Sequence, residues 1–169
     1  ISGQIRTAID VIKYDQDDIK AQAMDIAKKL YGKTPVIYTT DRMESVAVRL
    51  RQQINENAKL LCWHHVIPEM NHNELVGWKA QRDDVAVLYL RNKDDHRRNA
   101  VRIDINKKII AKLAGNVQEV YSNGQSLPEK MLYFVNLGDW VSYYMSEMHD
   151  VDSIEVDVID YLKSELAKV

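Results

Sequence analysis

Short apolar runs alternate with longer amphipathic segments along this 169-residue chain, and this alternation limits its possible folds more than any other feature. The runs are rich in β-branched and aromatic residues and are bounded by polar or turn residues, as strands are. They occupy residues 35–39, 60–63, 85–90 and 117–121. Short apolar strands separated by amphipathic helices favour a mostly parallel sheet covered on both faces. The sequence therefore predicts an α/β domain of three layers.

Helical periodicity marks the remaining segments. Residues 17–30 place their apolar side chains on one stripe, and Gly32 follows as a stop signal. A second helix is expected to begin between Asp41 and Ser45, and residues 127–149 and 156–168 are expected to close the chain as two more helices. Three positions form the expected core stripe of the second helix, namely Val46, Leu50 and Ile54. The segment 101–113 stays open, because its first half alternates like a strand and its second half repeats like a helix.

Charge and cysteine content exclude several classes of protein. Lys and Arg total 23 and Asp and Glu total 25, so the formal net charge of −2 gives no electrostatic footprint for nucleic acid or an anionic membrane. No apolar run approaches the roughly 18 residues that would indicate a membrane span. The single cysteine, Cys62, excludes an internal disulfide framework and favours a reducing, cytoplasmic compartment. Its apolar surroundings predict a core position for Cys62.

Polar loops follow three of the predicted strands, at 39–41, 64–74 and 91–96. In parallel sheets, ligands gather at the carboxyl ends of the strands, so these loops are candidate sites. The densest stretch, residues 68–78, holds two carboxylates, two amides and a histidine, which suit acid–base work on a polyhydroxy substrate. The alternative is structural: an asparagine caps a helix and Glu74 complements the dipole in its first turn.

Two further interpretations compete with simpler ones. A metal site built from His64, His65, His72 and Glu74 is disfavoured, because adjacent histidines on a strand point in opposite directions. No metal is expected. The hydroxyls of residues 39–40 resemble a phosphate cradle in position, but the loop lacks glycines and carries acidic residues, so helix capping is the favoured interpretation.

Residues 68–78, which read PEMNHNELVGW, look like the PE-x-NHNE-x-x-GW motif of the bifunctional phosphoglucose/phosphomannose isomerases. Four more segments resemble the same family in the same order, namely 47–59, 89–96, 137–144 and 159–163. The resemblance implies that residues 33–169 form a sugar isomerase (SIS) domain of three α/β/α layers, and that 1–32 are a helical lead-in. It also implies that this is the second of two SIS domains, with the first absent from the chain.

The resemblance implies a role for each matching residue. Glu74 matches the base that moves a proton between C1 and C2 of the sugar through a cis-enediol. His96 matches the histidine that opens the sugar ring, which in the family reaches the site of the neighbouring subunit, so a homodimer is implied. Lys163 matches a C-terminal lysine that contacts the substrate or its developing negative charge. No metal or organic cofactor is needed for such proton transfers.

Three residues are expected to support the substrate. His72 and Asn73 are expected to bind sugar hydroxyls or to fix the shape of the motif, and Arg49 to support the site or a domain interface. On the residues alone, His96 is also compatible with an exposed loop and Lys163 with a helix surface.

The expected function is aldose–ketose isomerisation of glucose 6-phosphate and mannose 6-phosphate to fructose 6-phosphate, with this half inactive alone. The alternatives are a non-catalytic, phosphosugar-binding SIS module, or a chain whose helices from Leu127 onward mainly pair subunits.

Overall fold

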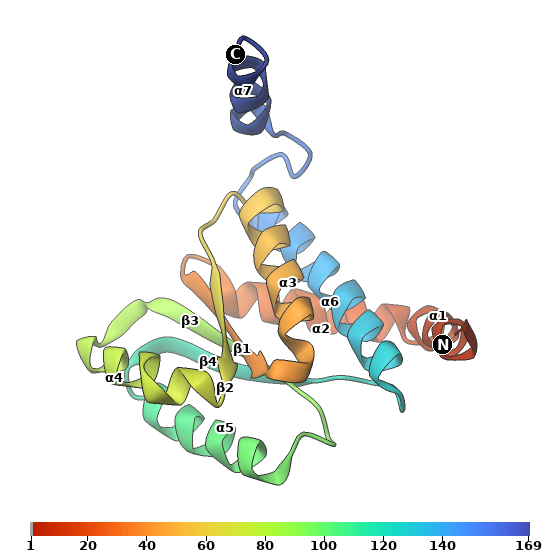
Figure 1. Ribbon diagram of the computed structural model, residues 1–169, viewed down its shortest axis with the longest axis vertical. Helices are drawn as coiled ribbons and strands as arrows, with labels where there is room; N and C mark the ends of the chain where they lie inside the picture. The colour runs from red at the N-terminus through yellow and green to blue at the C-terminus, as the bar shows by residue number, and fades with distance from the viewer. Residues whose placement is uncertain (1) are drawn as a thin grey trace.

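Four parallel strands form a single sheet in the computed structural model, which describes residues 2–169 (Figure 1). The strands are β1 (Thr34–Thr40), β2 (Trp63–Ile67), β3 (Arg82–Arg91) and β4 (Ala114–Tyr121), in the spatial order β2-β1-β3-β4. The prediction of a parallel sheet flanked by helices is confirmed. Because β1 and β3 lie in the middle of the sheet, their side chains are buried on both faces for most of their length.

Helices cover both faces of this sheet. The helices are α1 (Ser2–Tyr14), α2 (Gln16–Leu30), α3 (Glu44–Asn57), α4 (Glu74–Gly77), α5 (Arg97–Ile110), α6 (Leu127–Met148) and α7 (Asp157–Leu166). Short 3₁₀ turns occupy Asp41–Met43, Glu69–His72 and Trp78–Ala80. In Figure 1, α2, α3 and α6 lie on one side of the sheet, with α4 and α5 on the other.

The two faces bury separate cores. The larger core packs two predicted stripes, that of 17–30 and that of Val46, Leu50 and Ile54, against α6 and the central strands. The smaller core lies under α4 and α5 and contains Tyr38, Tyr89 and Trp78. The second face therefore carries side chains with polar atoms inside an apolar layer, and such atoms need partners.

The second strand differs from its prediction. The sequence predicts a strand at 60–63, whereas β2 runs from Trp63 to Ile67 and pairs Trp63 with Val36 of β1. Cys62 is buried in the core as expected, but Leu61 is 85% exposed. The apolar run marks the approach to the sheet rather than the strand. His64 and His65 belong to this strand, because an edge strand with one neighbour tolerates polar side chains. Their polarity therefore wrongly indicated a loop.

Two helices are defined by their packing. The ambiguous 101–113 segment belongs to α5, which buries Ile103, Asn106 and Ile110 at helical spacing. In α6 the buried face contains Phe134, Leu137, Val141 and Met145. Trp140 of α6 is only partly buried and Tyr143 is exposed, because the stripe that faces α2 and α3 is rotated from them.

The last helix stands apart from the layers. In Figure 1, α7 projects from the end of the body formed by α3 and α6, and none of its residues is buried. Across residues 2–169 no helix combines the length and the apolar character needed to cross a bilayer.

Candidate functional site

Glu74 lies on a segment that returns across one face of the sheet. After β2 ends at Ile67, the turn 69–72, α4 and the turn 78–80 carry the chain back to the start of β3 at Arg82. Glu74 therefore lies over the sheet face. The sequence predicted it at the carboxyl edge of the sheet, in the loop that follows a strand. His64 and His65, expected in the same loop, belong to β2 itself.

The motif around Glu74 is anchored by its asparagines. The Asn71 side-chain amide donates a 2.8 Å hydrogen bond to Asn106, which is buried in α5. Asn73 Oδ1 accepts the backbone N–H of Glu74, and Asn73 Nδ2 donates to Glu69 at 3.3 Å. Asn73 is therefore the N-cap of α4, as the structural interpretation predicts. His72 is exposed on the turn before it.

The Glu74 carboxylate is held by two aromatic side chains through a single oxygen. Tyr38 Oη donates to Oε1 at 2.5 Å, and Trp63 Nε1 donates to the same oxygen at 3.1 Å. Trp78 Nε1 in turn donates to the Tyr38 hydroxyl at 3.1 Å. Glu74 is half-buried, so it combines fixed partners with access from outside.

A hollow of about 190 Å³ adjoins this carboxylate. Glu74, Trp63 and Trp78 line it together with Arg82 and Val85 from the beginning of β3. Its walls are mainly aromatic and apolar, with one carboxylate and one guanidinium. This arrangement can place a proton acceptor beside a bound group that is partly shielded from water.

Reasoning from the sequence missed Tyr38 and Trp63 as the donors to Glu74, and Trp78 as the donor to Tyr38. Two signals were available. Trp78 is four residues after Glu74, which places both on one side of a helical turn. Tyr38 is a polar-tipped aromatic inside a buried strand, and such a hydroxyl usually finds a hydrogen-bond partner.

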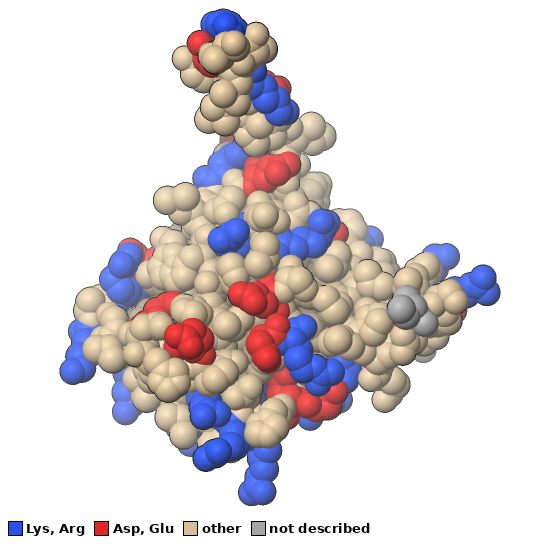
Figure 2. Space-filling model, viewed as in Figure 1, with Lys and Arg blue, Asp and Glu red and all other residues tan. Residues whose placement is uncertain are grey.

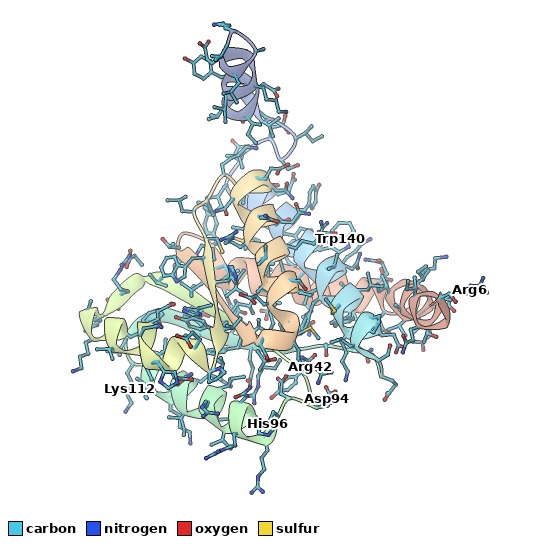
Figure 3. The ribbon with its side chains drawn as sticks, viewed as in Figure 1. Arg6, Arg42, Asp94, His96, Lys112 and Trp140 are labelled. Carbon is cyan, nitrogen blue, oxygen red and sulfur yellow. The ribbon has the colours of Figure 1, made fainter. Side chains whose placement is uncertain are left out.

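His96 lies beyond the carboxyl end of β3, away from the sheet face that Glu74 covers. It is the N-cap of α5, and its Nδ1 accepts the backbone N–H of Arg98 at 3.3 Å (Figure 3). Buried Arg91, at the end of β3, pairs with Asp104 of α5 and with Glu119 of β4, each at 2.7 Å. His96 itself is exposed and is not brought to Glu74 within this chain.

Arg49 lies on α3, which covers the other face of the sheet. Its guanidinium pairs with Asp139 of α6 at 3.0 Å, and Gln53 donates to the same carboxylate at 2.8 Å. This exposed pair joins two helices, and the structure does not bring Arg49 to Glu74.

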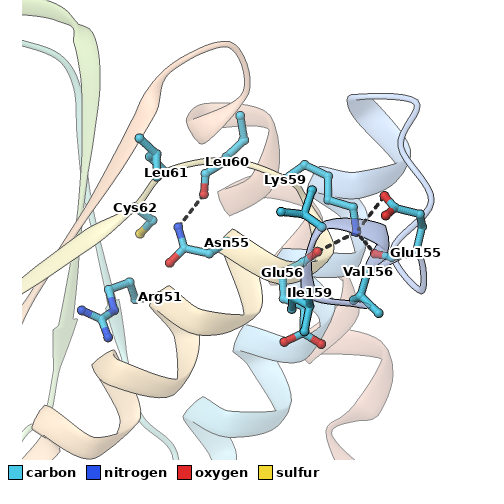
Figure 4. Close-up of a pocket in the computed structure, with 11 residues that line it drawn as sticks. Arg51, Asn55, Glu56, Lys59, Leu60, Leu61, Cys62, Glu155, Val156 and Ile159 are labelled. Carbon is cyan, nitrogen blue, oxygen red and sulfur yellow. Dashed lines mark hydrogen bonds and ion pairs between the residues drawn. The ribbon is translucent and has the colours of Figure 1, made fainter. Parts of the chain in front are cut away.

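Lys163 lies on the projecting helix α7. Its ammonium is exposed and pairs only with Asp160 in its own helix, at 3.3 Å, among the described residues. The link before α7 is attached to the body by Lys59, whose ammonium donates to the carbonyls of Glu56 and Glu155 (Figure 4). A hollow of about 610 Å³ separates the start of α7 from α3, lined by Cys62, Leu60 and Ile159 among others.

The carboxyl ends of β1 and β3 meet in a polar network rather than an open cradle. The Thr39 hydroxyl donates to the carbonyl of Leu90 at 3.0 Å, and the Thr40 hydroxyl donates to Asp95 at 3.2 Å. Neither hydroxyl caps the following turn, so the capping prediction is wrong here. These hydroxyls are used instead to tie β1 to β3 and its loop.

The two histidines of β2 have different surroundings. His64 faces α3, with its Nε2 4.0 Å from Glu44, and burial, with Arg51 nearby, lowers the pKa of its imidazole. His65 accepts the backbone N–H of Val66 through Nδ1. Within residues 2–169 no group of three or more His, Cys, Asp or Glu side chains is arranged to hold a metal ion.

Acidic and basic side chains are interspersed over the face shown in Figure 2. This agrees with the near-neutral composition. Neither sign dominates the face, so this surface has no extended field that would steer a polyanion to it.

The family model for the bacterial phospho-glucose isomerase C-terminal SIS domain matches residues 19–166. The bifunctional phosphoglucose/phosphomannose isomerase of Aquifex aeolicus is 34% identical over 98% of this chain and 52% of its own length. The enzyme of the same name from Caldicellulosiruptor bescii is 36% identical over 89% of this chain and 45% of its length. The chain thus spans about half the length of these curated relatives.

Solved structures share the fold at lower identity. A glucose-6-phosphate isomerase like protein from Thermus thermophilus has a TM-score of 0.63 at 20% identity, over 78% of this chain and 42% of that one. The C-terminal domain of glucosamine-fructose-6-phosphate aminotransferase from Francisella tularensis has a TM-score of 0.64 at 11% identity, over 90% and 48%. The family model covers most of this chain, from residue 19 to residue 166. This chain therefore belongs to the bacterial phospho-glucose isomerase C-terminal SIS domain family.

Proposed function

We propose that this chain is the half of an aldose–ketose isomerase that supplies the proton-transfer base, acting on glucose 6-phosphate, mannose 6-phosphate and fructose 6-phosphate. The observation that carries this proposal is the Glu74 carboxylate, which is held at one oxygen by Tyr38 and Trp63 and borders a hollow. The names of the relatives support the substrate class.

The proposed chemistry is a proton shuttle between neighbouring carbons. Glu74 takes the proton from C2 of the open-chain aldose, which leaves a cis-enediolate with its negative charge on O1. A proton then moves from the C2 hydroxyl to O1, through the cis-enediol arrangement, and Glu74 returns its proton to C1, which gives the ketose. A carboxylate suits this task because it can accept and donate the same proton without leaving its position. With the substrate's reacting carbons beside it, the carboxylate needs no metal or organic cofactor for this transfer.

Two further side chains of the proposed reaction, His96 and Lys163, do not lie beside Glu74 in this chain. We assign ring opening to His96 acting in the site of a second copy, since within one chain His96 lies beyond the carboxyl end of β3 and Glu74 lies over the sheet face. An uncovered apolar stripe on α5, made by Val101, Ile105 and Ile109, supports an interface beside His96. His72, Asn73 and Arg49 are proposed to support substrate binding, of which Asn73 also caps α4.

Lys163 is proposed to stabilise negative charge on the enediolate once α7 is docked. The apolar residues of α7, including Val158, Leu162 and Leu166, are exposed, and a partner surface outside this chain would cover them. A first SIS domain is the proposed partner, in keeping with the greater length of the relatives. On this proposal the chain by itself does not turn over substrate.

A coupled assay of fructose 6-phosphate conversion tests the assignment in the complete enzyme. Glu74→Gln removes the base but keeps the side chain's size, so turnover is expected to fall by about 10²- to 10⁴-fold. Glu69→Gln is the matched control, because Glu69 is an exposed carboxylate of the same motif whose replacement still accepts from Asn73. Turnover in Glu74→Gln as high as in the control would refute the role of Glu74.

The alternative is a phosphosugar-binding module without turnover. It is favoured by one observation, that neither His96 nor Lys163 is gathered at Glu74 in this chain. It predicts that sugar phosphates raise the melting temperature of the complete protein while no isomer is formed.

A further inference from the structure

The hydrogen bonds around Glu74 have a direction that chemistry alone fixes. An indole N–H can only donate, and an ionised carboxylate can only accept. The Tyr38 hydroxyl lies between the indole of Trp78 and the carboxylate of Glu74. It must therefore accept a hydrogen bond from Trp78 and donate its only proton to Glu74. The direction of donation, from Trp78 to Tyr38 and from Tyr38 to Glu74, therefore follows from the chemistry of the groups.

Both donors reach the same carboxylate oxygen. Tyr38 and Trp63 donate to Oε1, whereas no donor from residues 2–169 reaches Oε2. Two donors fixed on one oxygen set the plane of the carboxylate and leave the second oxygen unoccupied. The second oxygen is then the one that can exchange a proton with a substrate.

The anchor is more rigid than the residue it holds. Tyr38 is fully buried in the central strand β1 and contacts the ring of Tyr89, with 5.3 Å between the ring centroids. Burial, reinforced by the adjacent carboxylate, raises the pKa of Tyr38, so its hydroxyl keeps its proton and remains a donor. Glu74, by contrast, begins a helix of only four residues. The position of the carboxylate is therefore set by the sheet.

We propose that Tyr38, backed by Trp78 and assisted by Trp63, is the positioning residue that orients Glu74 for proton transfer through Oε2. This inference rests on the proposed role of Glu74 as the base. Tyr38 does not touch the reacting carbons in this proposal. It keeps the accepting oxygen aimed at them, and misplacement by about 1 Å costs about 100-fold in such reactions.

Tyr38→Phe in the complete enzyme is the direct test, because it deletes one oxygen from a buried ring. We expect kcat to fall about 10- to 100-fold, with KM for fructose 6-phosphate within about twofold of wild type. The primary isotope effect on kcat with substrate deuterated at the transferred position should rise, because proton transfer becomes more rate-limiting. A loss of folded enzyme alone would lower activity without changing this isotope effect.

Tyr89→Phe is the matched control. Tyr89 is the neighbour of Tyr38 in the sheet, is equally buried, and has a hydroxyl with no partner among the described residues. Its loss should leave kcat and the isotope effect unchanged. If Tyr38→Phe does not fold, Trp63→Phe removes the other donor to Oε1 at a partly exposed site and should change kcat in the same direction.

The outcomes separate this inference from the function on which it rests. Full activity in Glu74→Gln would overturn the role of the base itself. An inactive Glu74→Gln together with wild-type kcat and isotope effect in Tyr38→Phe would overturn only the positioning role. Equal losses in Tyr38→Phe and Tyr89→Phe would also overturn it, since any buried hydroxyl would then serve.

Discussion

The segment around Glu74 and the C-terminal helix α7 both carry residues of the family motifs, yet only the first is packed against the sheet. Glu74 is surrounded by Tyr38, Trp63 and Trp78, which come from two strands and a turn. Lys163 contacts only Asp160 of its own helix among the described residues. Motif resemblance therefore identifies both residues equally, while the fold of this chain surrounds only Glu74 with partners from other elements.

The difference has a physical cause in how each segment meets the sheet. The segment 68–81 crosses one sheet face between two strands, so its side chains Met70 and Trp78 are buried in the core that the sheet shares with α5. Helix α7 follows the last layer and has no sheet face left to cover. An amphipathic helix in that place gains little from its apolar side until another surface meets it.

The largest effect is expected at Trp78, which is 5% exposed and donates to Tyr38. Trp78→Ala should lower the free energy of unfolding of this chain by about 3–5 kcal/mol, because it leaves a cavity under α4. Urea unfolding measures this loss. Trp140→Ala, at a partly exposed site on α6, is the control and should cost less. Equal losses at the two sites would show that the segment around Glu74 is not held more firmly than the surface of α6.

A smaller effect is expected at Asn71. Asn71→Ala should cost about 1–3 kcal/mol, because the buried Asn106 oxygen loses its donor. The double variant with Asn106→Leu should recover part of this stability, since no unpaired polar group then remains. Denaturant unfolding of the three proteins gives the comparison, and a double variant less stable than Asn71→Ala would contradict it.

The smallest effect is expected on α7. Leu162 is 57% exposed, so Leu162→Ala should change the stability of this chain by no more than about 0.5 kcal/mol. In the complete enzyme, where the proposal docks α7 on a further domain, the same change should cost about 2 kcal/mol or more. A negligible cost in both proteins would contradict the docking of α7 through its apolar side.

The local pattern of the sequence was sufficient for the layers and for most helices. The stripes of 17–30 and of Val46, Leu50 and Ile54 are buried as predicted, because helical spacing decides which side chains share a face. It was insufficient for β2, where the apolar run 60–63 precedes the strand. Strand limits depend on the partner strand, and here the register with Val36 of β1 decided where pairing begins.

For the candidate site, the sequence by itself determined only the motif around Glu74, whose resemblance to the family identifies this carboxylate as the base that we propose. Only the tertiary structure decided what holds that carboxylate. Tyr38 lies 36 residues before it in the chain, and a contact across that distance follows from sheet topology rather than from spacing. Tertiary structure likewise separated Glu74 from His96 and Lys163, since each side chain goes where its own element is packed, and α7 has no such packing in this chain.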